Sequence, residues 1–153
     1  MGRLFDAMAS TLGIRQRVTY EGQAAIELEN LADPQEAYAY TVSFTDDEVN
    51  ILQLYPQILS DLRAGSPISI ISARFHNALT KLCLDCCNTI RAESGINRVA
   101  LSGGVWQNTT LLVKTSNKLC NAGFEVLVHH RVPTNDGGIA LGQIMIADSI
   151  MRN

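Results

Sequence analysis

Two glycine turns are the parts of this sequence whose residue types and spacing could hold a ligand. The first turn contains Gly103 and Gly104 and connects a predicted strand over 98–101 to a predicted helix over 106–121. A strand that runs through glycines into a helix brings backbone N–H groups to one point, where an anion or a nucleotide can bind. The glycines let the backbone approach that ligand without a Cβ atom, and Asn108 could offer its amide to a base or ribose.

The second turn places a carboxylate, Asp136, beside a glycine pair at the start of a predicted helix over 138–150. A carboxylate at a helix N-terminus is stabilised by the unpaired N–H groups there, so one interpretation of Asp136 is an ordinary N-cap. The alternative is a metal ligand, because a carboxylate can hold Mg²⁺, Zn²⁺ or Fe²⁺ beside nucleotide phosphates. His129 and His130 precede this turn. Adjacent strand residues point to opposite faces, so we interpret these histidines as loop residues and not as one metal site.

The C-terminal half of the chain alternates between strand and helix patterns. The predicted order is a strand over 98–101, a helix over 106–121, a strand over 124–128 and a helix over 138–150. This order indicates two parallel, neighbouring strands joined by a right-handed crossover. Ligands of open α/β sheets bind at the carboxyl ends of the strands, where both glycine turns lie. We therefore expect the two turns to close over one ligand.

Apolar periodicity predicts helices in most of the remaining chain. These helices cover residues 2–13, residues 21–32 and residues 68–94, the last ending at Gly95. A weak alternation over 37–44 predicts a short edge strand. Thr45 and Glu48 have the spacing of a capping box, which predicts a further helix through Leu62 that Pro56 breaks or restarts.

The composition is that of a globular domain without a nucleic-acid or membrane partner. At 153 residues, with 46% hydrophobic and 18% charged residues, the chain is long enough for one core, and we expect a single domain over 1–153. The net charge of −3 and the lack of a Lys/Arg cluster give no electrostatic footprint for nucleic acid. No apolar run is long enough to span a membrane and no signal peptide opens the sequence, so we expect a cytoplasmic protein.

We interpret three cysteines and one histidine on the predicted helix over 68–94 as structural residues. Cys83, Cys86 and Cys87 have the spacing of half a zinc site, but they share the apolar face of the helix. Because free cysteine behaves as a small hydrophobe, we interpret them as core thiols. We expect a neighbouring carbonyl or carboxylate, and no metal, to satisfy His76. The sequence also lacks a Ser/His/Asp order, a P-loop and a GxGxxG motif, so an enzyme with this sequence would act by holding a nucleotide and a metal.

Five segments, spread over essentially the whole chain, carry a family resemblance. In chain order they are MGRLFDAMASTLGI, YEGQAAIELENLA, ISARFHNAL, LSGGVWQN and GFEVLVHHRVPTNDGGIALGQIMIA. Together they resemble the C-terminal end of the HypF-type hydrogenase maturation carbamoyltransferases, which are related to the tRNA threonylcarbamoyl transferases. The resemblance implies an α/β fold: the helix-rich half of an actin-like ATPase (ribonuclease H-like) domain, with a small, partly parallel sheet.

The resemblance also implies an activity and a set of site residues. Members of this family transfer a carbamoyl group from carbamoyl adenylate, made with ATP, to the C-terminal cysteine of HypE, on the way to the cyanide ligands of nickel–iron hydrogenase. The residues that match nucleotide-binding positions are Gly103, Gly104, Asn108, Asp6 and Gly22. Asp136 matches the aspartate that binds a divalent metal (Zn, Fe or Mg) in the related transferases.

Several parts of the family pattern are missing from this sequence. They are the paired-histidine metal motif and the acylphosphatase, zinc-finger and YrdC-like parts. We therefore expect a C-terminal lobe that needs the missing N-terminal portion of the same protein and a HypE-like acceptor, and that is inactive alone. The alternative, from another class, is a non-catalytic interaction module that docks on a HypE-like partner or forms a homodimer through an exposed face. A sugar-kinase-like ATPase lobe is a third interpretation.

Overall fold

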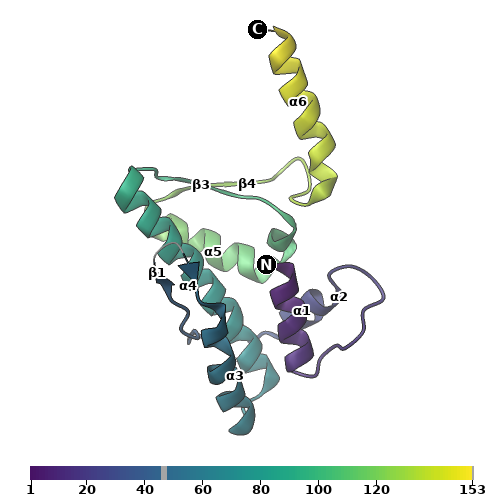
Figure 1. The fold of residues 1–153 in the computed structure, drawn as a ribbon, viewed down its shortest axis with the longest axis vertical. Helices are drawn as coiled ribbons and strands as arrows, with labels where there is room; N and C mark the ends of the chain where they lie inside the picture. Colours follow the sequence, from purple (N-terminus) through teal and green to yellow (C-terminus); the bar gives the residue numbers. More distant parts are fainter. Residues whose placement is uncertain (46–47, 153) are drawn as a thin grey trace.

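Helix α4 (Ile68–Ser94) is the central element, and most of the chain packs against it (Figure 1). The structure is a computed structural model that describes residues 1–45 and 48–152. The other elements, in chain order, are α1 (Gly2–Thr11), α2 (Gln23–Leu31), β1 (Phe44–Thr45), β2 (Glu48–Val49), the 3₁₀ helix η1 (Ile51–Gln53), α3 (Leu54–Arg63), β3 (Arg98–Leu101), η2 (Gly104–Gln107), α5 (Thr109–Asn121), β4 (Glu125–Val128), η3 (Asp136–Gly138) and α6 (Ile139–Arg152). None of the described helices is long and apolar enough to cross a membrane.

The long helix predicted over 68–94 is confirmed as α4, and Gly95 ends it in the left-handed conformation with a φ of 71°. Helices α1, α2 and α3 cover its N-terminal half and form the larger core with it. In this core Phe5 of α1 meets Phe75 of α4 edge to face, with ring centroids 5.1 Å apart. Other members of the core are Met8, Leu28, Leu54, Ile58 and Ile71.

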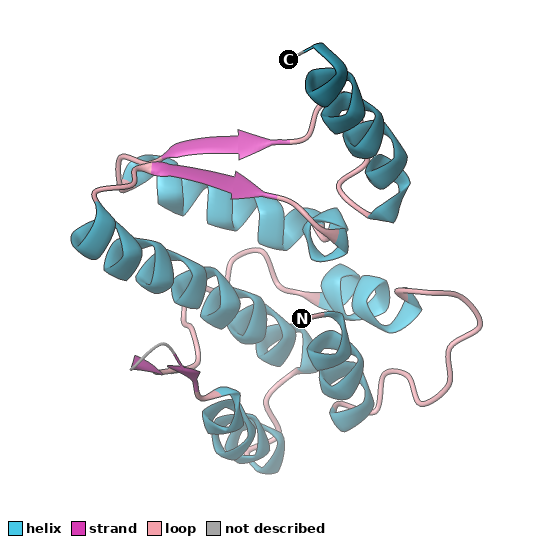
Figure 2. Cartoon of the chain, turned by 45° about the horizontal axis from the view of Figure 1, so that its top comes forward, coloured by secondary structure: helices cyan, strands magenta, loops and turns pink. Residues whose placement is uncertain are grey.

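Strands β3 and β4 are parallel, with Arg98 opposite Glu125. Helix α5 connects them, which confirms the predicted order of strand, helix, strand and helix. Helices α4 and α5 lie together on one face of this sheet (Figure 2), where Leu101, Leu119 and Phe124 form a second core. Because the strands are parallel, the loops that follow them leave the sheet at the same edge.

The cysteines of α4 belong to the second core. Cys83 and Cys87 pack against it as free thiols. Burial raises the pKa of the Cys83 thiol to about 12, so this group stays protonated and unreactive at neutral pH. The interpretation as core thiols is confirmed for these two residues.

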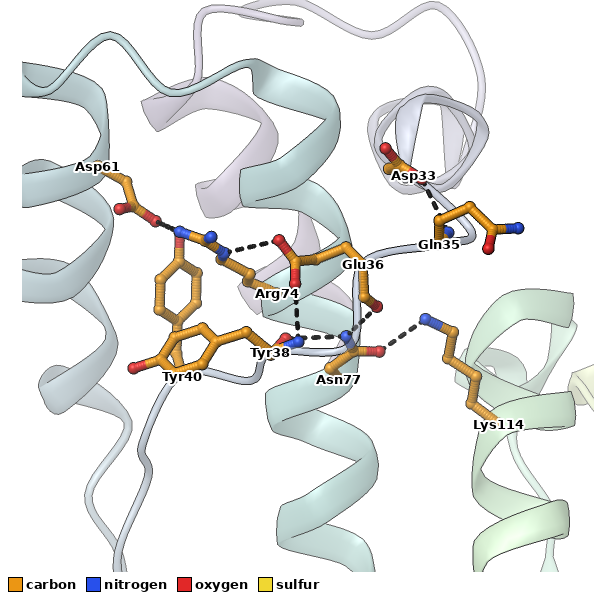
Figure 3. Close-up of polar contacts among 9 residues, drawn as sticks. All are labelled: Asp33, Gln35, Glu36, Tyr38, Tyr40, Asp61, Arg74, Asn77 and Lys114. Carbon is orange, nitrogen blue, oxygen red and sulfur yellow. Dashed lines mark hydrogen bonds and ion pairs between the residues drawn. The ribbon is translucent and has the colours of Figure 1, made fainter.

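The edge strand predicted over 37–44 is wrong for most of its length, because this segment is extended without pairing to another strand. Side-chain amides take the place of a neighbouring strand. The Asn77 amide donates to the carbonyl oxygens of Glu36 and Tyr38, both at 2.9 Å (Figure 3). The side-chain amide of Gln57 likewise bonds the backbone of Thr41: it accepts from the N–H and donates to the carbonyl oxygen, both at 2.9 Å.

Arg74 of α4 fixes the same segment through a charged cluster (Figure 3). Its guanidinium lies 3.1 Å from the Glu36 carboxylate and 2.8 Å from the Asp61 carboxylate. The Tyr40 hydroxyl donates to Asp61 at 2.6 Å. The hydroxyl and the guanidinium both hold the pKa of Asp61 below its ordinary value, so the carboxylate stays ionised. The cluster thereby ties α3, α4 and the extended segment together.

The predicted capping box is also wrong. Thr45 and Glu48 lie opposite each other in the antiparallel pair of β1 and β2, so they do not bracket a helix N-terminus. The helix begins later, with η1 followed by α3 at Leu54. Pro56 lies in the first turn of α3, where its missing N–H would have no partner within the helix. The predicted restart of the helix near Pro56 is confirmed.

Substituting Asn77→Ala tests whether side-chain amides hold the extended segment. We expect the free energy of unfolding to fall by about 1–3 kcal/mol, because two backbone carbonyls and the Lys114 ammonium lose their partner. Denaturant titration measures this change. The matched control is Asn117→Ala on the exposed side of α5, which should change the same quantity by at most about 0.5 kcal/mol. Equal effects of the two substitutions would contradict this account of the segment.

Candidate functional site

An open groove of about 1100 Å³ lies where α1 and the turn before α2 meet the two glycine turns. Of the six site residues predicted from the sequence, all but Gly103 line this groove: Asp6, Gly22, Gly104, Asn108 and Asp136. The fold therefore brings together residues from both ends of the sequence. Their roles in binding a ligand stay predictions.

A backbone hydrogen bond joins the two glycine turns. The N–H of Gly103 donates to the carbonyl oxygen of Thr134 over 2.8 Å. Gly103 has a φ of 105°, a conformation that favours glycine. At the same edge of the sheet, Nε2 of His129 lies 2.9 Å from the hydroxyl of Ser102. The turns thus meet on one side of the sheet, as the parallel topology predicts, and His129 lies in the loop after β4.

Gly104 leaves room in the groove. A Cβ atom at Gly104 would meet nothing closer than the Cβ atom of Asn135, 3.9 Å away, and the backbone there is not in the left-handed region. Neither strain nor crowding within the protein therefore explains this glycine, and its surface is available to a ligand. Gly22 differs, because it is the left-handed N-cap residue of α2, with a φ of 77°. The turn alone accounts for the glycine at that position.

Asn108 lies outside the helix that was predicted over 106–121, because α5 begins only at Thr109. Asn108 is the N-cap of α5, and its Oδ1 accepts from the N–H of Leu111 over 2.7 Å. Its Nδ2 lies 3.0 Å from Nε2 of His76. The amide is therefore engaged within the protein at both ends, which leaves at most one Nδ2 hydrogen for a ligand.

His76 connects the groove to the larger core. The ring is fully buried, and its Nδ1 lies 2.8 Å from the carbonyl oxygen of Ser72, so Nδ1 carries the proton and donates it. Nε2 then accepts from the amide of Asn108. Burial lowers the pKa of His76 below its ordinary value and keeps the ring neutral. The prediction that a carbonyl satisfies His76 is confirmed, whereas no sequence pattern indicated the bond to Asn108.

The interpretation of Asp136 as an N-cap is wrong. Asn135 caps η3 instead, with its Oδ1 3.1 Å from the N–H of Gly137. Asp136 is exposed at the groove. Among the described residues no group of three His, Cys, Asp or Glu lies together in a way that could hold a metal ion. The described residues therefore do not fit a resident metal by themselves, and Asp136 can supply only one ligand to it.

Carboxylates dominate the charge along the groove. They are Asp6, Glu21, Glu29 and Asp136, and the guanidinium of Arg3 also lines it. Glu29 is already engaged, because its carboxylate accepts from the hydroxyl of Thr109 at 2.7 Å and from the N–H of Thr110 at 2.8 Å. The remaining acids favour ligand hydroxyl groups and cation-bound phosphates over bare phosphates. Glu21 and Glu29 were not predicted as groove residues, because no local pattern distinguishes them from other helix acids.

Comparison with known proteins decides the family. The sequence model of the family described as "Carbamoyltransferase, Kae1-like Domain, second subdomain" matches residues 1–143. The chain belongs to this family. The HypF carbamoyltransferase of Synechocystis sp. is 39% identical over 150 residues, which cover 95% of this chain and 19% of the relative. The HypF carbamoyltransferase of Rhizobium leguminosarum bv. viciae is 36% identical over 154 residues, which cover 100% of this chain and 20% of the relative.

Two solved HypF structures contain a similar region. The crystal structure of full-length HypF in the phosphate- and nucleotide-bound form matches with a TM-score of 0.90 and 45% identity, over 100% of this chain and 21% of the HypF chain. The crystal structure of T. kodakarensis HypF matches with a TM-score of 0.85 and 29% identity, over 99% of this chain and 20% of that chain. The resemblance to HypF found in the sequence is confirmed. The chain spans about a fifth of the length of the HypF relatives it matches.

The neutral state of His76 predicts a pH dependence of stability. We expect the free energy of unfolding to decrease as the pH falls below 6.5, the ordinary pKa of histidine, because the unfolded chain then binds a proton that the folded chain does not. Above that pH the neutral ring of His76 makes its full contribution to the free energy of unfolding. Denaturant titrations between about pH 7.5 and pH 5.5 measure it.

Two variants separate His76 from other titrating groups. His76→Gln should flatten the pH dependence in this window, whereas His130→Gln, at an exposed position, should leave it unchanged. A slope that survives His76→Gln would show that the buried ring is not its source.

Proposed function

We propose that this chain is the nucleotide-binding lobe of a HypF carbamoyltransferase and that its groove holds carbamoyl adenylate or ATP. The observation that carries the proposal is the convergence of Asp6, Gly22, Gly104, Asn108 and Asp136 on one groove of about 1100 Å³. A volume of this order suits a nucleotide-sized ligand. The similar full-length HypF that was crystallised in a phosphate- and nucleotide-bound form supports it. The same proposal includes the finer assignment of the fold to the actin-like ATPase class.

The chemistry of the groove suggests how the nucleotide lies. The carboxylates of Asp6 and Glu21 are acceptors suited to ribose hydroxyl groups. The bare backbone at Gly104 admits the phosphate end of the ligand beside the second turn. There, Asp136 would supply one ligand to a divalent ion that arrives with the phosphates, since Mg²⁺ commonly binds one or two carboxylates together with substrate phosphates.

The proposal assigns the transfer reaction to a larger assembly. The chain spans about a fifth of its HypF relatives, and its described residues do not complete a metal site. We therefore propose that the other parts of a HypF protein complete the site and that a HypE-like protein accepts the carbamoyl group. This lobe would bind the nucleotide and position it, without catalysing the transfer alone.

Filling the space at Gly104 tests the groove. We expect Gly104→Val to lower the affinity for Mg²⁺–ATP by about tenfold or more, because the new side chain occupies ligand space. Isothermal titration calorimetry of the 153-residue chain measures the affinity. Gly142→Val on α6 is the matched control, since that glycine lies outside the groove and has nothing within 4 Å of its Cβ position. Equal affinities of the two variants would reject the groove as the nucleotide site.

Removing the charge of Asp136 tests its role at the phosphates. Asp136→Asn should weaken the binding of Mg²⁺–ATP, because the ion loses a ligand, but should not weaken the binding of ATP in EDTA, because a repulsive charge is also lost. The same titrations with and without Mg²⁺ measure both affinities. Glu93→Gln removes a charge from an exposed position on α4 and should change neither. Equal losses with and without the ion would contradict a role at a metal-bound phosphate.

A further inference from the structure

Asn108 reaches the groove from a fixed position inside the protein. It is only 8% exposed, yet it lines the groove. Its Oδ1 accepts from the N–H of Leu111, and its Nδ2 lies 3.0 Å from Nε2 of His76. Because the amide group has an internal partner at each end, a bound ligand would meet this side chain in one orientation.

The ring of His76 decides which atom of the amide faces it. The oxygen and the nitrogen of an asparagine amide have nearly the same shape, so only their hydrogen-bond partners distinguish the two orientations. Nδ1 of His76 donates to the carbonyl oxygen of Ser72, and burial lowers the pKa of the ring, so Nε2 carries no hydrogen. Nε2 can therefore only accept, and Nδ2 of Asn108 must face it. The opposite orientation would place Oδ1 against a lone pair.

The backbone N–H groups at the start of α5 are largely engaged within the protein. The N–H of Thr110 donates to the Glu29 carboxylate at 2.8 Å, and that of Leu112 donates to the carbonyl oxygen of Asn108 at 3.0 Å. Oδ1 of Asn108 takes the N–H of Leu111. Free N–H groups at a helix N-terminus commonly bind anions, but three of them have internal partners here. The remaining Nδ2 hydrogen of Asn108 is thus a donor that this end of α5 can still offer to a ligand.

We propose that His76 is a positioning residue for the nucleotide: it fixes Asn108 so that this side chain presents only a hydrogen-bond donor to the groove, where an acceptor atom of the ligand lies against it. The inference rests on the proposed function, in which the groove holds carbamoyl adenylate or ATP. His76 does not touch the ligand itself. Its ring is fully buried and meets Phe5 of α1 edge to face, with the ring centroids 5.5 Å apart.

A fixed donor has a specific value in this groove. The ionised carboxylates of Asp6, Glu21 and Asp136 can only accept hydrogen bonds. A nucleotide carries hydroxyl groups that match such acceptors, but its phosphate oxygens and ring nitrogens need donors. If the amide of Asn108 could turn its oxygen toward the groove, it would repel these atoms. By preventing that rotation, His76 would make the site select for an acceptor at this position.

Substitutions of His76 test the positioning role. His76→Leu removes the acceptor and frees the amide of Asn108, so we expect the affinity for Mg²⁺–ATP to fall about tenfold. His76→Gln should keep the affinity within about threefold, because its Oε1 can accept in place of Nε2. Asn77→Ala also removes hydrogen bonds made by α4 but lies outside the groove, so it controls for lost stability and should leave the affinity unchanged. Isothermal titration calorimetry of the 153-residue chain measures all four affinities, that of the unaltered chain included.

A second pair of substitutions tests the donor itself. Asn108→Asp keeps an oxygen for the N–H of Leu111, since Asp caps a helix as well as Asn does, but it replaces the donor with an acceptor. Gln107→Glu adds the same charge at the neighbouring position of the groove and so measures the effect of charge alone. We expect Asn108→Asp to weaken the binding of Mg²⁺–ATP at least about tenfold more than Gln107→Glu does. Equal losses would overturn the assignment of a donor.

The ¹⁵N signals of His76 provide a readout that a merely structural role would not move. We expect a ring protonated only at Nδ1 in the unaltered chain, with and without Mg²⁺–ATP. In Asn108→Asp the pKa of His76 should rise, because a carboxylate then faces Nε2. Glu29 of α2 and Lys114 of α5 also act on the pKa of this ring, in opposite directions, and both are unchanged in every variant. A proton on Nε2 in the nucleotide complex would overturn the inference.

The outcomes separate this inference from the proposed function. If the unaltered chain binds Mg²⁺–ATP and His76→Leu binds it equally well, His76 has no positioning role, while the nucleotide-binding function stands. If the unaltered chain does not bind Mg²⁺–ATP, the proposed function fails and the inference fails with it. Loss of affinity in His76→Leu and Asn108→Asp, with recovery in His76→Gln, would support both.

Discussion

The position of the first glycine turn depends on buried hydrogen bonds through His76. These hydrogen bonds form one series, which runs from the carbonyl of Ser72 through the ring of His76 and the amide of Asn108 to the N–H of Leu111. Because His76 lies in α4, which takes part in both cores, the start of α5 is fixed relative to the central helix. Removing the side chain of His76 or of Asn108 leaves a buried polar group without its partner, which is costly in a protein interior. Buried hydrogen bonds therefore hold the side of the groove that the first glycine turn and Asn108 form.

Local sequence patterns predicted the elements where tertiary contacts reinforce the local pattern. The apolar periodicity of α4, the short apolar runs of β3 and β4 and the parallel order that follows from them all agree with the structure. The failures have a common physical cause. In the extended segment over 37–43, amides from α3 and α4 satisfy backbone groups that a strand would have paired with another strand. At Thr45 and Glu48, pairing between strands replaced the cap. Neither competitor is visible in a short window of sequence.

The candidate site likewise has features that a local sequence pattern predicts and features that depend on contacts between distant residues. The sequence identified five residues that line the groove: Gly104, Asn108 and Asp136, because glycine turns after parallel strands must meet at one edge, and Asp6 and Gly22 through the family resemblance. It could not identify what holds them, since the decisive bonds join residues far apart in the chain, such as His76 to Asn108 and Glu29 to Thr109. It also pointed to Asp136 as a possible cap, whereas Asn135 caps η3. Both side chains are good caps, and only the path of the loop decides which oxygen reaches the free N–H.

The acidic lining of the groove has a consequence for selectivity. An acyl adenylate keeps one ionised phosphate, whereas ATP carries a triphosphate, so the carboxylates along the groove repel ATP more strongly. For the proposed ligands, this field would favour the activated intermediate over the nucleotide from which it is made. The lobe would then retain the compound that still has to react and release the more highly charged precursor, by electrostatics alone.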